Sequence, residues 1–286
     1  MWVDRNNGHS LMKVRYRDIR VNYFPSLAGG GEAWADCFVQ VVRKLFGKVE
    51  KICEFASGPG FIGFSLLAND LCEKLTLVDV NPEAVRVCLS TVEENQLGDR
   101  VSIFGSNGLD AVPETERWNL VVMNPPFEYC TRYDYEHTFA QGYYTLRIFD
   151  PEWAIHRQFY KQVGRFLFPA GSVLAAEDWK FPGLWRRMVE AAGLEFVKCF
   201  YVDRPPARFS SRFGRAVNAW EYFSKSYSKD KLHKSSDPRS YRDSLSLARR
   251  VVYDLHILGR DTVDAAWRSA DHQSFYFVWS RTKEIK

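Results

Sequence analysis

Long apolar runs and metal-binding motifs are missing from this 286-residue sequence. No stretch is apolar for the roughly 18 or more residues that a membrane-spanning helix needs, so we expect no such helix. The N-terminal residues lack the apolar centre of a signal peptide, which favours a cytoplasmic location. The six cysteines include no CxxC pair and the six histidines no HExxH pair, so we expect reduced cysteines and no metal site.

Acidic and basic residues nearly balance, and the formal net charge is +4. The exception is the stretch 204–250, which holds twelve Lys or Arg and only four Asp or Glu. Aromatic residues are interleaved with these basic residues. Such a stretch suits phosphate contacts and base stacking, which makes nucleic acid a candidate partner, although a solvated surface is its more common role. The sequence indicates no membrane partner and leaves the oligomeric state open.

Strand-like and helical patterns alternate after residue 50. Apolar, strand-like runs occupy 51–57, 74–80, 101–106, 120–124, 172–178, 194–203 and 273–281. Helical periodicity is found at 82–96, 151–167 and 184–193. β–α–β alternation with continuously apolar strands is typical of a parallel sheet with helices on both faces, so we expect an α/β fold.

The helical stretches carry their own boundary signals. Pro82 suits the first turn of a helix, in which Val85, Cys88 and Leu89 would share the buried face. The chain is interpreted as one domain with four parts. These are an N-terminal cap (1–49), a core (50–203), a basic insert (204–272) and a last strand (273–286).

A glycine loop, CEFASGPGFIG, follows the first core strand at residues 53–63. Gly58 and Gly60 would let a ligand approach the backbone closely, and Gly63 would let the next helix pack against the sheet. Asp79 ends the following strand, at the offset where a ribose diol would be held. Glu54 precedes the glycines, and a negative charge there suits a cationic ligand better than a diphosphate.

This loop resembles motif I of the class I S-adenosylmethionine (SAM)-dependent methyltransferases, with Ala56 where the first glycine often stands. LVDVNPEAV resembles the second motif of that family, which implies that Asp79 binds the ribose. FGSNGLDAV resembles the third, which implies that Ser106 and Asn107 meet the adenine. The resemblance implies SAM as cofactor and a Rossmann-like, mostly parallel seven-stranded sheet with helices on both faces.

The run NLVVMNPPF (119–127) ends a buried strand abruptly, because proline cannot extend a central strand. It is similar to the Asn/Asp-Pro-Pro-aromatic motif of amino and amide N-methyltransferases, including adenine N6, cytosine N4 and release-factor glutamine N5 enzymes. Asn124 Oδ1 and the Pro125 carbonyl would accept the N–H groups of a planar nitrogen, on which Phe127 would stack. Two prolines would keep these acceptors aimed.

Aromatic residues after this motif, with Phe24 on the other side, are interpreted as an enclosure for the acceptor: Tyr129, Tyr133 and Tyr143. A helical hairpin that buries these aromatics is the alternative. An enclosing lid and a mild net charge favour a small-molecule acceptor with an amine or amide nitrogen. A nucleic-acid base amine, a protein glutamine and a non-catalytic SAM-binding module remain alternative functions.

Overall fold

The computed structural model describes residues 11–24, 27, 31–126, 128–130, 132, 149–177, 182–202 and 275–283. The chain divides into two compact units, Met1–Glu177 with Met188–Phe200 and Phe277–Lys286, and Asp178–Arg187 with Tyr201–Tyr276. All the site residues discussed below belong to the first unit. Within the described residues, no helix has the length and apolar character needed to cross a membrane.

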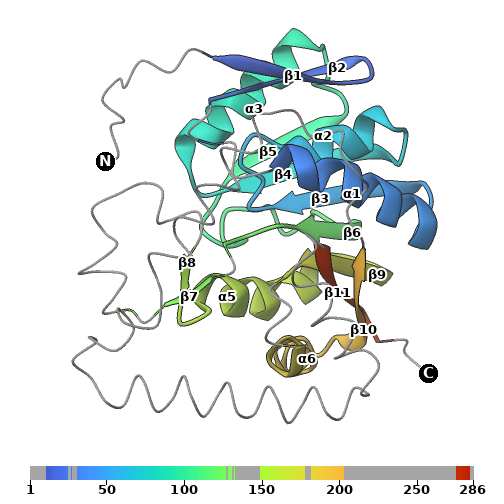
Figure 1. Ribbon diagram of the computed structural model, residues 1–286, viewed down its shortest axis with the longest axis vertical. Helices are drawn as coiled ribbons and strands as arrows, with labels where there is room; N and C mark the ends of the chain where they lie inside the picture. The colour runs from blue at the N-terminus through green and yellow to red at the C-terminus, as the bar shows by residue number, and fades with distance from the viewer. Residues whose placement is uncertain are drawn as a thin grey trace. The chain divides into compact units, whose positions relative to one another are not determined.

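A central sheet of seven strands organises the chain (Figure 1). Its strands, in spatial order, are β10 (Glu195–Val202), β11 (Phe275–Arg281), β9 (Leu167–Ala176), β6 (Trp118–Met123), β3 (Val49–Phe55), β4 (Cys72–Asp79) and β5 (Val101–Gly105). The pairs β9–β6, β6–β3, β3–β4 and β4–β5 are parallel, whereas β11 runs antiparallel to β9. The expected α/β fold with a mostly parallel seven-stranded sheet is confirmed.

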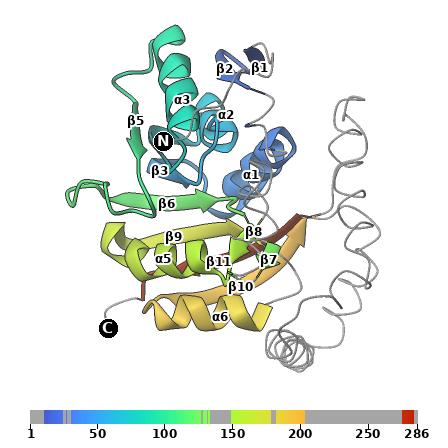
Figure 2. The same ribbon diagram turned by 90° about the vertical axis from the view of Figure 1, so that its left-hand side faces the viewer.

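Helices cover both faces of this sheet (Figure 2). One face carries α1 (Gly31–Leu45), α2 (Phe61–Ala68) and α3 (Pro82–Glu94), and the other carries α5 (Ala154–Val163). A short 3-10 helix, η4 (Gly164–Phe166), follows α5, and α6 (Pro182–Ala191) precedes β10. The central strands β3 and β6 end in unbroken buried runs, because both of their faces are covered.

Helix α3 begins as the sequence predicts but presents a different face to the core. Pro82 occupies the first turn, and the side chain of Asn81 caps the helix by accepting the N–H of Glu83 at 3.0 Å. The expected buried face is wrong at Leu89, which is 53% exposed. Val87 and Thr91 are buried instead, because a hairpin that the sequence analysis did not predict packs on that side.

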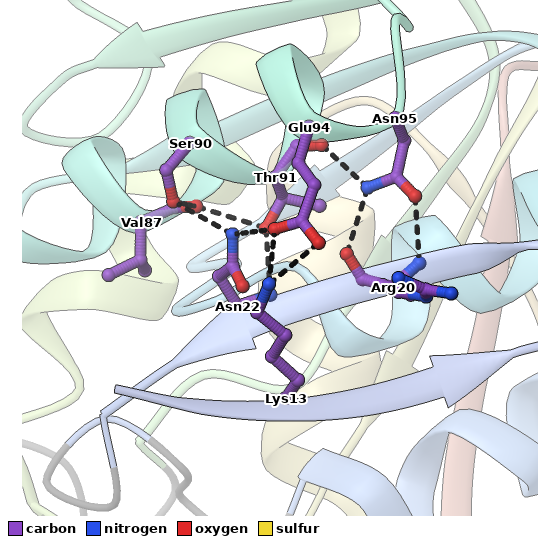
Figure 3. Close-up of polar contacts among 8 residues, drawn as sticks. All are labelled: Lys13, Arg20, Asn22, Val87, Ser90, Thr91, Glu94 and Asn95. Carbon is purple, nitrogen blue, oxygen red and sulfur yellow. Dashed lines mark hydrogen bonds and ion pairs between the residues drawn. The ribbon is translucent and has the colours of Figure 1, made fainter. Parts of the chain in front are cut away.

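This hairpin consists of β1 (Met12–Tyr16) and β2 (Ile19–Tyr23), and polar contacts attach it to α3 (Figure 3). The buried N–H of Asn22 donates to the Thr91 hydroxyl at 2.9 Å. Lys13 forms an ion pair with Glu94 at 2.7 Å, and Arg20 and Asn95 exchange hydrogen bonds. The hairpin therefore holds the chain that leads to Phe24 at a fixed position beside α3.

The expected helix over 151–167 is wrong at both of its ends. Residues Phe149–Pro151 form the strand β8, which pairs with β7 (Glu128–Cys130), and β9 already begins at Leu167. The helix itself starts at Ala154, where the carboxylate of Asp150 accepts the N–H groups of Ile155 and His156. Because this carboxylate satisfies the first turn, the preceding residues need not be helical.

Candidate functional site

The predicted cofactor and acceptor residues meet at one edge of the sheet. Phe55 pairs with both Val78 and Met123, and Asp79 pairs with Gly105. Since parallel strands point the same way, the residues after β3, β4, β5 and β6 emerge at the same carboxyl edge. Strand order reverses at β3, whose two neighbours are β4 and β6, and such a switch point is where open α/β sheets bind ligands.

The glycine loop after β3 adopts a conformation that favours glycine at three positions. Ala56, Gly58 and Gly60 have φ angles of 54°, 50° and 79°. A Cβ at Gly60 would lie 2.8 Å from the Phe64 ring, and one at Gly58 would lie 3.6 Å from the Leu27 carbonyl oxygen. The left-handed φ of Ala56 explains why related motifs often carry glycine there. Gly58 is partly exposed and has no side chain to keep a ligand from its backbone.

Glu54 lies at the end of β3 and is almost completely buried. Its carboxylate accepts the N–H of Gly63 at 2.7 Å, where a Cβ would lie 2.8 Å from the carboxylate oxygen. The expected role of Gly63 in close helix–sheet packing is therefore confirmed. Burial raises the pKa of Glu54 to about 8, against the N–H groups of Gly63 and Ile62, which lower it.

Asp79 is held rigidly at the end of β4. Its two carboxylate oxygens accept the N–H groups of Gly58 at 2.7 Å and Asn81 at 2.8 Å. Burial raises its pKa, and these N–H donors lower it. Each oxygen has a second lone pair, so a ribose diol fits here as a donor of two further hydrogen bonds. Val80 follows with 67% of its surface exposed, an apolar face for a flat ring that sequence reasoning missed.

Ser106 and Asn107 lie just after β5, next to Asp79. The N–H of Ser106 donates to the Asp79 carbonyl at 2.9 Å, and the Ser106 hydroxyl accepts the N–H of Ala111 at 2.9 Å. Asn107 is exposed, and its carbonyl accepts a hydrogen bond from Gln158 of α5. Asn107 therefore presents an amide side chain at the edge where the adenine is expected, while its backbone is held from behind.

Asn124 and Pro125 follow β6 directly. The Asn124 Oδ1 atom is buried and has no hydrogen-bond partner within the part of the chain that the structure describes. Leaving a buried acceptor unpaired costs roughly 1–3 kcal/mol, so this atom has the character of a ligand-binding group. Phe127, Tyr133 and Tyr143 lie outside the described residues, as does the side chain of Tyr129.

Phe24 lies on the chain that leaves the hairpin, and its carbonyl accepts the N–H of Leu27 at 2.8 Å. The Arg86 guanidinium is centred 5.6 Å from the Phe24 ring. Because the carbonyl of Leu27 lies against Gly58, this segment runs along the glycine loop. The structure thus brings Phe24 close to the cofactor side of the site, whereas the sequence analysis assigned it to the acceptor.

Sequence reasoning missed a buried charged cluster at the same edge. His156 of α5 contacts Asp150 through Nδ1 at 2.6 Å and Glu177 through Nε2 at 3.0 Å. Burial alone would lower the pKa of His156, but Glu177 and Asp150 raise it to about 9. Glu177 comes directly after β9, which pairs with β6 near Asn124. No local spacing signals this cluster, because each residue belongs to a different element.

Comparison with known proteins agrees with this geometry. Residues 35–141 match the family model described as the methyltransferase small domain. The ribosomal RNA small subunit methyltransferase C of a Marinomonas species is 33% identical over 96 residues, which is 34% of this chain and 26% of that protein. The release factor glutamine methyltransferase of Clostridium acetobutylicum is 30% identical over 79 residues, 27% of this chain and 28% of that protein.

A solved structure extends the likeness to the fold. The crystal structure of the cyclase SpnF has a TM-score of 0.50 and 12% sequence identity, over 87% of this chain and 82% of that one. The chain therefore has a class I methyltransferase fold, and it carries a SAM-dependent methyltransferase domain, as its motifs indicate. It spans only about a quarter of the length of the curated relatives, at 26% and 28%.

The donors and acceptors at the edge fit SAM. The partly exposed backbone at Gly58 suits the methionine chain of SAM, the Asp79 carboxylate suits its ribose, and the exposed side chain of Val80 suits its flat base. The Glu54 carboxyl lies behind this loop, where it faces the amino end of α2. The assignments of Glu54, Ala56, Gly58, Gly60, Asp79, Ser106 and Asn107 as cofactor-binding residues remain predictions.

Proposed function

We propose that this chain is a SAM-dependent N-methyltransferase that acts on a planar nitrogen of a macromolecule, with an RNA base amine as the leading acceptor. The observation that carries the proposal is the buried Asn124 Oδ1 at the carboxyl end of β6, which has no hydrogen-bond partner among the residues that the structure describes. The fold alone would not support it, because folds host many functions and the similar structure of SpnF is a cyclase.

The proposed chemistry rests on orientation. SAM supplies a methyl group on a positively charged sulfur. Asn124 Oδ1 and the Pro125 carbonyl accept the N–H groups of the acceptor nitrogen and turn its lone pair toward that methyl. Both acceptors bind more strongly as the nitrogen becomes positive, which stabilises the transition state. The proton then leaves to solvent, so no strong base is needed.

The two relatives support a macromolecular acceptor, because one is named for ribosomal RNA and the other for a release-factor glutamine. They give no support to the small-molecule acceptor that the sequence analysis favoured. RNA is placed first because the match to the RNA enzyme is longer and because residues 204–250 are strongly basic. A protein glutamine is the second candidate, on the strength of the other relative.

The test is transfer of a radiolabelled methyl group from SAM to ribosomal RNA, to intact ribosomal subunits and to glutamine-containing protein. We expect the label in RNA. Asn124→Ala should lower turnover by about 10²–10³-fold, as the loss of one oriented transition-state hydrogen bond does. Its SAM affinity, measured by calorimetry, should stay close to that of the wild type, because Asn124 faces the acceptor.

Asn119→Ala is the matched control. Asn119 lies at the other end of β6, where its Oδ1 accepts the N–H of Lys51 at 2.9 Å. This change costs stability but leaves the site intact, so turnover per folded molecule should be unchanged. Label in protein alone would replace RNA by the glutamine candidate. SAM binding without label in any polymer would leave a binding module and refute the proposal, as would full activity of Asn124→Ala.

A further inference from the structure

Two glutamines of α5 hold the loop that follows β5. Gln162 accepts the N–H of Leu109 at 2.8 Å and donates to the Asp110 carboxylate. Gln158, one helical turn earlier, donates to the Asn107 carbonyl and to Asp110, both at 3.2 Å. The loop over residues 107–110 is therefore bonded to α5 at two backbone groups and at one side chain.

The fit between loop and helix is close at Gly108. Its φ is +60°, and a Cβ there would lie 2.6 Å from Gln158 Nε2 and 2.7 Å from Gln162 Oε1. Any other residue would push the two amides away from the loop. The absence of a side chain at Gly108 thus makes room for the two glutamine amides, although these residues are about 50 positions apart in the chain.

Helix α5 is itself well fixed. The Phe159 ring lies 4.6 Å from that of Phe55, the last residue of β3 before the glycine loop. Asp150 holds the first turn of the helix through the N–H groups of Ile155 and His156. The helix is therefore tied to the strand that carries the glycine loop, and the glutamines tie the loop after β5 to the same helix.

We propose that Gln158 and Gln162 are positioning residues for the adenine side of the cofactor pocket. They act through the loop, by fixing where the Asn107 backbone stands relative to Asp79 and the glycine loop. The inference rests on the proposed function, since it takes the ligand at this edge to be SAM. Without the glutamines the loop must be ordered when the ligand binds, which weakens binding but leaves the transfer step unchanged.

The experiment uses the full-length chain and a polarity exchange: one variant puts a charge opposite Asp110, and a second change at Asp110 restores a matching hydrogen-bond donor. Gln162→Glu keeps an acceptor for the Leu109 N–H but sets a carboxylate against Asp110. We expect the affinity for SAM and for its demethylated product, measured by calorimetry, to fall by about tenfold. Adding Asp110→Asn restores a donor opposite the new carboxylate, so the double variant should regain affinity to within about twofold of the wild type.

Gln96→Glu is the matched control, because Gln96 is exposed and follows α3, which lies on the opposite face of the sheet from α5 (Figure 2). Its SAM affinity should be unchanged. With an RNA acceptor, Gln162→Glu should raise KM for SAM while kcat stays the same. Equal affinity of Gln162→Glu and wild type would overturn the inference. So would an affinity loss that Asp110→Asn does not reverse, since that marks general damage.

The experiment distinguishes failure of the proposed function from failure of the positioning role. If the wild-type chain does not bind SAM, the cofactor assignment itself is wrong and the inference falls with it. If the wild type binds SAM and all variants bind equally well, only the positioning role is lost. If the polarity exchange behaves as expected but no polymer is methylated, the positioning role stands and the transferase proposal does not.

Discussion

Glu54 occupies an unusual position for a residue whose charge is expected to attract a cation. Its carboxyl is buried behind the glycine loop, and burial raises its pKa to about 8. At neutral pH the ligand-free protein therefore holds this group mainly in its neutral form. A cationic ligand nearby would favour the ionised form, so binding should release a proton.

This gives a prediction about the pH dependence of SAM binding. Below about pH 8 the affinity should rise with pH, by about tenfold per unit at most, because Glu54 must lose its proton. Above about pH 8 the affinity should level off. Calorimetry in buffers with different ionisation enthalpies measures the proton released at each pH.

Glu54→Gln is the comparison that isolates this group from the amine of the ligand. The variant should bind SAM more weakly at pH 8.5 or so than the wild type, and its remaining pH dependence should come from the ligand alone. If wild type and variant show the same pH profile, Glu54 stays neutral in the complex and serves only to hold the start of α2.

Single residues with a local backbone role were the easiest to predict. Pro82 acts through the geometry of its own turn, and Gly63 belongs to a short glycine motif, so the sequence around each carries the signal. Leu89 was misassigned because the buried face of α3 depends on the β1–β2 hairpin, some 70 residues earlier in the chain. Helical periodicity shows which residues share a face of the helix, but not which distant segment packs against that face.

At the scale of elements, a cluster of buried charged residues connects β8, α5 and the end of β9. His156 lies between Asp150 and Glu177, and none of the three side chains is more than slightly exposed. A buried charged cluster of this kind rarely adds stability over an apolar packing, yet breaking it is costly. It fixes three elements in one arrangement beside Asn124, the proposed acceptor-binding residue.

The cluster predicts how stability depends on pH. The pKa of His156 is raised from its ordinary 6.5 to about 9, so the folded state binds this proton more tightly than the unfolded chain. Its stabilisation is present in full below about pH 6.5 and is lost as pH rises through about 9. Urea unfolding at a series of pH values should show this loss, which amounts to roughly 3 kcal/mol.

His156→Gln should be less stable at neutral pH by about 3–5 kcal/mol, because two buried carboxylates lose their cation. The variant should also lose the fall in stability between about pH 6.5 and 9 that belongs to His156. An unchanged slope in the variant would assign that pH dependence to other groups, such as Glu54.

Elements were predictable where the pattern was long and local. The seven strands of the central sheet all carry apolar runs, and each was placed to within a few residues. The strands β7 and β8 have three residues each and pair across about 20 residues of chain, so no periodicity marks them. The charged cluster has a similar origin, since Glu177 after β9 reaches His156 only in the fold.

At the scale of the whole molecule, the residues proposed to bind the cofactor and those proposed to bind the acceptor follow different strands of the sheet. The glycine loop, Asp79 and the loop after β5 form the proposed cofactor side, and Asn124 with the end of β9 forms the proposed acceptor side. The sequence motifs predicted that these residues would meet at one edge of the sheet, because each motif sits at a strand end. They did not predict how α5 contacts both sides, because its glutamines and histidine form no recognisable motif.

The basic stretch 204–250 lies outside the described residues, and only its charge indicates a role for it. A macromolecular RNA acceptor needs contacts beyond one base, and phosphate contacts make binding depend on salt. If this stretch supplies such contacts, it sets the affinity for RNA without affecting SAM. That separates it from the strand-edge residues, whose replacement should alter SAM binding or methyl transfer under the proposed function.

Replacing Lys225, Lys229 and Lys231 by glutamine should therefore weaken RNA binding and flatten its salt dependence. The slope of log K against log salt should shrink by about 0.7 for each lysine, or about 2 in total for single-stranded RNA. The controls are three exposed lysines on other elements, changed in the same way: Lys44, Lys74 and Lys161. Fluorescence anisotropy over a salt series, at saturating SAM, measures both slopes. Equal slopes for the two triple variants would show that the stretch contributes only general charge, whereas a change confined to the first would make 204–250 the RNA-binding surface.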